Sequence, residues 1–135
     1  MKKKFLLILL VLAASTFAWK KEAHFISLPL IEGSGLYSSI MILEESKTTS
    51  TKVPAAATVS LLAVNAALGA TAVFGPQDLY PTFRTIHRYI GFGLTAAGLW
   101  MSIAAGNDRN VKNLERNVSY GYTVLTAVPI IIFSF

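Results

Sequence analysis

The sequence predicts an all-α membrane protein, a bundle of four transmembrane helices arranged as two tandem helical hairpins and preceded by a signal peptide. Three observations predict this class. Of the 135 residues, 53% are hydrophobic and 14% are charged, and the mean hydropathy is +0.54, which is more apolar than a typical soluble domain. The apolar residues form stretches of about bilayer length. The two halves of the chain also resemble each other.

Residues 1–18 are typical of a secretory signal peptide. Three lysines precede an apolar core over residues 5–14, and the small residues Thr16 and Ala18 stand at the positions expected before a cleavage site. We expect cleavage after Ala18, which leaves residues 19–135 as the mature domain. An uncleaved anchor helix is the alternative, but the apolar run over 5–19 is shorter than the roughly 20 residues that span a bilayer comfortably.

Three later stretches, 55–75, 89–106 and 118–135, are free of charge and close to bilayer length, so each predicts a transmembrane helix. A fourth stretch, 24–43, is long enough but contains Pro29, Glu32 and Gly33. Its alternative interpretation is an irregular surface segment followed by a short amphipathic helix.

The basic residues favour four spans. With 24–43 inside the membrane, five basic residues lie on the cytoplasmic side and four outside; without it, seven lie outside against two inside, which contradicts the positive-inside rule. The five are Lys47, Lys52, Arg109, Lys112 and Arg116, and the four are Lys20, Lys21, Arg84 and Arg88. We therefore expect a multi-pass protein of a bacterial-type inner membrane, with both mature termini outside.

The first hairpin can be laid on the second in one register, without gaps. "KEAHFISLPLIEGSGLYSSI" then matches "RTIHRYIGFGLTAAGLWMSI", pairing the histidines, one glycine, one leucine, one serine and one isoleucine: His24 with His87, Gly35 with Gly98, Leu36 with Leu99, Ser39 with Ser102 and Ile40 with Ile103. We interpret this as a duplication with pseudo-twofold symmetry, its repeats covering about 21–75 and 84–135. A chance match of small-residue packing patterns is the alternative.

Two stripes of small or polar residues follow the histidines at helical spacing, and in lipid such stripes belong inside a bundle. On the second hairpin the stripe is His87, Gly91, Thr95, Gly98 and Ser102, and on the first it is His24, Leu28, Glu32, Gly35 and Ser39. Two inward histidines at equivalent heights are the axial ligands that a planar b-type haem needs. Gly91 would leave room for the porphyrin, and Lys21, Arg84 and Arg88 would face its propionates.

The motif "HRYIGFG" at 87–93, opening a transmembrane helix in a four-helix bundle with paired histidines, resembles the small membrane b-type cytochromes, the cytochrome b561-like and ferric-reductase-like bundles. The resemblance implies electron transfer through haem b, with quinol or a membrane protein as the redox partner. It covers little beyond residues 84–106 and the helix count. The b561 pattern has four histidines for two haems, whereas this chain has two, enough for one.

Each of these residues also has a simpler interpretation. A histidine at a membrane border is often an amphipathic residue without a ligand. Glu32 has two interpretations. It either takes part in proton transfer or contacts quinol beneath the haem, or it lies where Pro29, Gly33 and Gly35 break the helix. In the second case, water or free backbone amides would solvate its carboxylate. A non-catalytic accessory or assembly subunit of a larger membrane complex is the alternative function, favoured by the small-residue pairs Ala66/Ala70 and Asn65/Gly69.

Several function classes are excluded by what the chain lacks. It contains no cysteine, and no hydrolase, kinase or nucleotide-binding motif. Its net charge of +5 is scattered through the loops, where it sets membrane topology rather than binding nucleic acid. Any enzymatic activity would therefore be a redox activity, and the partner predicted with most support is the lipid bilayer.

Overall fold

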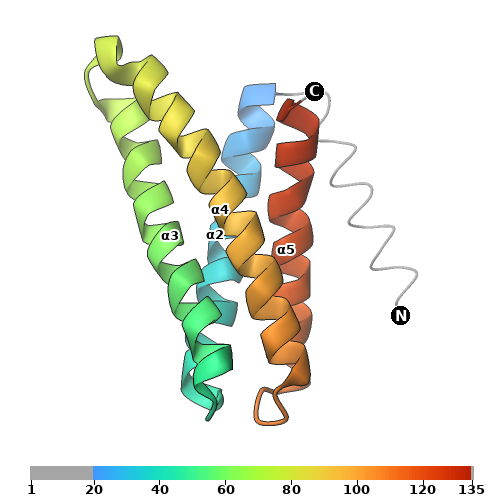
Figure 1. Ribbon diagram of the computed structural model, residues 1–135. Helices are drawn as coiled ribbons and strands as arrows, with labels where there is room; N and C mark the ends of the chain where they lie inside the picture. Colours follow the sequence, from blue (N-terminus) through green and yellow to red (C-terminus); the bar gives the residue numbers. More distant parts are fainter. Residues whose placement is uncertain (1–19, 135) are drawn as a thin grey trace.

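The computed structural model describes the backbone of residues 20–134 and the side chains of residues 28–71 and 74–128. This part of the chain forms four long helices joined by short turns, with one short 3-10 helix, η1, before the third (Figure 1). The bounds are α2 Lys20–Glu45, α3 Thr49–Phe74, η1 Gln77–Leu79, α4 Tyr80–Asn107 and α5 Asn113–Ser134. The expected signal peptide, 1–18, lies outside the described residues.

The helices run alternately up and down and form a ring. Each packs against its neighbours in sequence, and α5 closes the ring by packing against α2. The helices α2 and α4 are therefore diagonal partners that touch only locally, and α3 and α5 occupy the other diagonal. This is the arrangement that short connections between antiparallel neighbours produce in a four-helix bundle.

The helices extend beyond the apolar stretches that predict them. For example, α4 begins at Tyr80, well before the start of the predicted span at 89, with Pro81 in its first turn, where a missing N–H costs nothing. The segment α2 is also a continuous helix through Pro29, so the irregular backbone of the alternative interpretation of 24–43 does not form. The apolar stretch marks only the part of a helix that is kept from water. The ends of the helix depend on capping residues and prolines, as at Gly75 and Pro76 after α3.

At the centre of the bundle, the ring of Tyr122 lies between the two diagonal helices. A Cβ atom added to Gly35 on α2 would lie 2.5 Å from Cε2 of this ring, and one added to Gly98 on α4 would lie 2.8 Å from Cε1. Tyr122 is fully buried. The two glycines therefore let α2 and α4 approach opposite edges of one aromatic ring.

Below the ring, toward the turns that follow α2 and α4, the diagonal helices touch directly. Ser39 Oγ lies 3.4 Å from Met101 Sδ, and both side chains are fully buried. Ile42 and Ala105 continue the same core toward the helix ends. The core is thus closely packed from the Tyr122 ring to this end of the bundle.

Two loops meet at this end through Asp108, which follows α4. Its Oδ2 atom accepts hydrogen bonds from the hydroxyls of Ser46, at 2.5 Å, and Thr48, at 2.9 Å, in the turn between α2 and α3. Its Oδ1 atom accepts two bonds from Asn110, both 2.9 Å. We call Asp108, Ser46, Thr48 and Asn110 the loop clasp. The Ser46 hydroxyl and then the Asn110 donors lower the pKa of Asp108 from its ordinary value, against the opposing effect of burial.

A second contact links the same two loops, but here the carboxylate comes from the end of α2 and binds the loop between α4 and α5. Glu45, the last residue of α2, accepts the backbone N–H of Lys112 at 2.9 Å and forms an ion pair with the Lys112 ammonium group. Lys112 lowers the pKa of Glu45 through these contacts, and Glu45 raises the pKa of Lys112. Each loop therefore receives a carboxylate from the helix end of the other hairpin.

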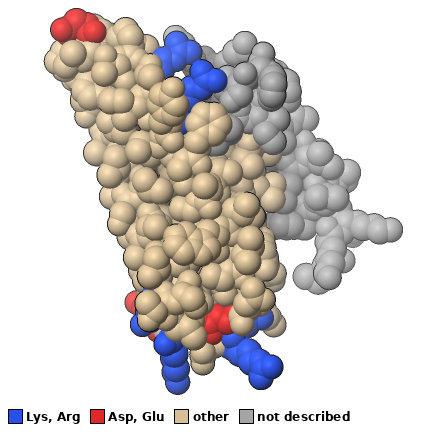
Figure 2. Space-filling view, viewed as in Figure 1, with Lys and Arg blue, Asp and Glu red and all other residues tan. Residues whose placement is uncertain are grey.

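One face of the bundle has a middle part without charged side chains, which we call the uncharged belt (Figure 2). On the face that Figure 2 shows, the lysine and arginine side chains lie at the two ends of the bundle and the middle carries none. The exposed residues of this belt include Leu36, Val64, Leu99 and Val124. Among the described residues, two stretches, Thr49–Thr71 and Gln77–Asn107, are long and apolar enough to cross a membrane.

The contact between Gly35 and Tyr122 leads to a stability prediction. Gly35→Ala should destabilise the fold by about 1–3 kcal/mol, because the added methyl group has no free space beside the ring. Gly33→Ala, two residues away on the same helix, is the control, since a Cβ there would meet no atom within 4 Å. The unfolding midpoint of each variant in mild detergent measures the difference. Equal midpoints for the two variants would contradict the packing described here.

The loop clasp predicts an acid dependence of stability. Because the pKa of Asp108 is lower in the folded state, its carboxylate stabilises the fold above about pH 4, the ordinary range for an aspartate, and this contribution is lost as the pH falls through the folded-state pKa. Asp108→Asn should lower the unfolding midpoint at pH 7 and lose less stability on acidification than wild type. Asp78→Asn, at an exposed position in η1, should behave as wild type. An Asp108→Asn variant as stable as wild type at pH 7 would refute the role of the clasp.

Candidate functional site

The histidine of α4 lies on the inward face of its helix. The buried residues of α4 include Leu94, Gly98 and Ser102, and His87 is two helical turns before Leu94 on the same face. The His87 side chain is half-buried, as are Gly91 and Thr95 of the predicted stripe. The stripe of α4 therefore faces the bundle interior along its length, most completely at its clasp end.

The predicted stripe of α2 behaves in the same way where its side chains are described. Gly35 and Ser39 are buried, and Leu28 and Glu32 are half-buried. The backbone at Lys21 and His24 belongs to α2, but both side chains lie outside the described residues. Since α2 and α4 run in the same direction, His24 and His87 belong to the same end of the bundle, opposite the loop clasp (Figure 1).

The helix axes diverge toward the histidine end. In Figure 1, α3 and α4 lean together away from α2 and α5 as they approach η1. Gly91 lies one turn below His87, and a Cβ atom added there would meet no atom within 4 Å. By contrast, a Cβ atom added to Gly98, two turns further along α4, would lie against the Tyr122 ring. The immediate surroundings of Gly91 are therefore less crowded than those of Gly98.

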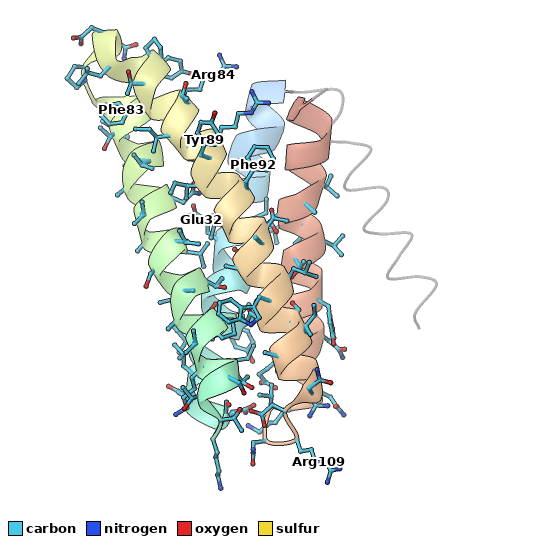
Figure 3. All side chains as sticks on the ribbon, viewed as in Figure 1. Glu32, Phe83, Arg84, Tyr89, Phe92 and Arg109 are labelled. Atoms are coloured by element: carbon cyan, nitrogen blue, oxygen red, sulfur yellow. The ribbon has the colours of Figure 1, made fainter. Side chains whose placement is uncertain are left out.

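The arginines that flank His87 lie at the surface of the histidine end. Arg84 and Arg88 are both exposed, and Figure 3 shows Arg84 near the tip of α4 with Tyr89 and Phe92 below it on the same helix. Tyr89 is 69% exposed and Phe92 is 41% exposed. Aromatic residues next to basic ones are typical of the boundary between a membrane and water. Arg84 and Arg88 are thus placed to bind anionic groups at that boundary.

Glu32 lies inside the bundle, on a helix that does not break. Its Oε1 atom accepts a hydrogen bond of 3.3 Å from Nδ2 of Asn65 on α3. The expected break at Pro29, Gly33 and Gly35 does not occur, because α2 continues as a helix over 26 residues. An interruption of the backbone therefore does not account for this acid, and its packing partners must do so.

Two residues of this interior have contacts that the sequence alone does not reveal. The sequence pairs Asn65 with Gly69 for helix packing and favours an interhelical hydrogen bond from its amide, but it does not name the partner, which is Glu32; the Asn65 side chain is 8% exposed. Tyr122 carries no signal in the sequence beyond an aromatic residue in an apolar run. Its role depends on Gly35 and Gly98, which belong to two other helices, and such pairings become visible only once the helices are packed.

Comparisons with protein-family models, with curated proteins and with solved structures each gave no match to this chain. The assignment of function therefore depends on the geometry of these residues.

Proposed function

We propose that this chain is a membrane electron-transfer protein that binds one b-type haem between His24 and His87. The observation that carries the proposal is the position of His87, half-buried on the inward stripe of α4 at the end where α2 brings His24. Two imidazoles on diagonal helices of a bundle can supply the two axial ligands of one iron.

The proposed fold is a four-span bundle made by duplication of one hairpin. The ends of the helices support it, since the register that pairs His24 with His87 also aligns the helix boundaries. In this register, the end of α2 lies within one residue of the end of α4. The start of α3 likewise lies within one residue of the start of α5. The uncharged belt on the face in Figure 2, and the length and apolar character of Thr49–Thr71 and Gln77–Asn107, support insertion of the bundle in the lipid bilayer.

The residues around His87 fit a haem group. A Cβ atom added to Gly91, one turn from His87, would meet no atom within 4 Å, so the backbone there is open to a neighbouring group. Arg84 and Arg88 are exposed at the membrane border, where their guanidinium groups would bind propionates, together with Lys21 of α2. The haem would supply reversible uptake of a single electron. The protein's own residues would hold the group, orient it across the bundle and separate it from the lipid.

A membrane quinol or a membrane redox protein is the partner proposed to donate the electron, because the site is reached from the bilayer and its border. Transfer onward would take place at the histidine end, which is the outer face of an inner membrane in the proposed topology. A single haem cannot relay electrons across the whole bilayer, so the proposed protein exchanges electrons on one side.

The haem proposal predicts a spectrum that depends on both histidines. Protein purified from haem-replete cells should give the reduced-minus-oxidised difference spectrum of haem b, and His24→Ala or His87→Ala should abolish it. Thr85→Ala, at an exposed position two residues from His87, is the matched control and should keep the spectrum. A colourless wild-type preparation, or one whose colour survives His87→Ala, would overturn the proposal.

A second candidate function is an accessory subunit of a larger membrane complex. The observation that favours it is the exposed small-residue face of α3, where Ala66 and Ala70 are both open to the surroundings. Small residues let transmembrane helices approach closely. A subunit of this kind would pack α3 against a partner.

This second candidate predicts that bulky side chains on α3 disrupt an assembly. Extraction in mild detergent followed by size analysis should show a complex larger than one chain, and Ala66→Ile with Ala70→Ile should release the monomer. Ala96→Ile, at an exposed position on α4, should leave the complex intact. A monomer from the outset would count against the accessory function.

A further inference from the structure

Glu32 is a half-buried acidic residue midway along α2. Figure 3 shows it on α2, between the two charged ends of the bundle that are marked by Arg84 and Arg109. A carboxylate in a membrane interior needs compensation of its charge. Its hydrogen bond from Asn65 comes from a neutral amide, which reduces the cost but leaves the charge in place.

The phenol of Tyr122 is the second part of this site. Its ring passes between α2 and α4 at Gly35 and Gly98, and Gly35 lies one helical turn from Glu32 on α2. The hydroxyl oxygen is fully buried and has no hydrogen-bond partner in the described part of the chain. A buried hydroxyl without a partner is uncommon and indicates a missing group.

Asn65 is the third part. Its Nδ2 atom faces Glu32, while its Oδ1 atom is buried and has no hydrogen-bond partner among the described residues. The oxygen and nitrogen of an amide are assigned from their hydrogen bonds, and a half-turn of the amide group exchanges them. A positive charge beside Glu32 would favour the rotated form, in which Oδ1 also faces it.

We propose that Glu32, Asn65 and Tyr122 bind one small monovalent cation, for which sodium is the probe. The three side chains offer a carboxylate, an amide oxygen and a phenol oxygen, which are hard oxygen donors of the kind that such cations prefer. One cation would compensate the charge of Glu32, and it would be bound by the Tyr122 hydroxyl oxygen and, after the half-turn of the amide, by Oδ1 of Asn65.

The charge of the site selects a monovalent ion over a divalent one. One carboxylate and one monovalent cation form a neutral pair, whereas a divalent ion would leave a net positive charge in the interior of the bundle, where an uncompensated charge is costly. Among the described residues, no group of three His, Asp or Glu side chains gathers as a divalent metal site would require. Glu32 is only half-buried, which gives an ion access to the site.

This inference depends on the packing of α2, α3 and α5 and on the membrane-embedded position of Glu32, and it does not require haem. Its test uses the full chain in uncharged detergent, with sodium chloride replaced by choline chloride at constant ionic strength. A ligand that binds only the folded state raises the unfolding midpoint. We expect a rise of about 10 °C when sodium reaches about 100 times its Kd.

The variants separate the site from general salt effects. Glu32→Gln should abolish the rise, and Tyr122→Phe and Asn65→Leu should reduce it. The matched controls are Glu44→Gln, at an exposed position on the same helix as Glu32, and Tyr120→Phe, at an exposed position two residues from Tyr122, and both should respond as wild type. Equilibrium binding of radioactive sodium should give one ion per wild-type chain, so the proposal remains testable if a variant fails to fold.

Two outcomes would overturn the cation site: no effect of sodium on the wild-type midpoint together with no bound sodium, or an equal response in Glu32→Gln. The haem spectrum of the same preparations keeps the two proposals apart. A haem spectrum without a sodium response removes only the cation site, and a sodium response in colourless protein removes only the haem.

Discussion

The packing of one aromatic ring between two glycines sets the width of the bundle at its centre. Tyr122 reaches from α5 between Gly35 and Gly98, and a methyl group on these glycines would lie 2.5 Å and 2.8 Å from the ring. Toward the loops, this close approach continues through Ser39 and Met101. Toward the histidines the helices separate (Figure 1). The ring is therefore the level at which a closed, structural half of the bundle meets a more open half.

The same ring explains why a duplicated bundle would not be symmetric in its side chains. The register that pairs the two histidines places Val59 at the position of Tyr122, and only one side chain can occupy the centre of a pseudo-twofold arrangement. A second tyrosine would collide with the first. In the same register, Glu32 corresponds to Thr95, so an interior acid beside the ring occurs once. Packing therefore requires the two repeats to differ at the centre of the bundle. The two glycines lie on opposite sides of the ring, so they can be the same in both repeats.

The sequence predicts the elements of this fold better than their contacts. The lengths of the apolar runs and the spacing of His87, Gly98 and Ser102 are local properties, and they predict the helices and the inward face of α4. The loop clasp joins two turns that lie far apart in the chain, and Asn65 bonds to an acid on a different helix. Such contacts depend on how four helices pack together, which a periodic pattern does not specify. The continuity of α2 through Pro29 is likewise decided by packing, which can outweigh the local tendency of proline to end a helix.

The two proposed sites would influence each other because they share a helix in a medium of low polarity. His24 and Glu32 are eight residues apart on α2, a rise of about 12 Å. Two unit charges at that separation interact by about 1.4 kcal/mol at an effective dielectric constant of about 20. An electron held between His24 and His87 would therefore be stabilised by a cation at Glu32, and by reciprocity the electron would tighten cation binding by about tenfold. Without the cation, the charge of Glu32 would oppose reduction by a similar amount, so that occupancy of the cation site would determine how readily the haem accepts an electron.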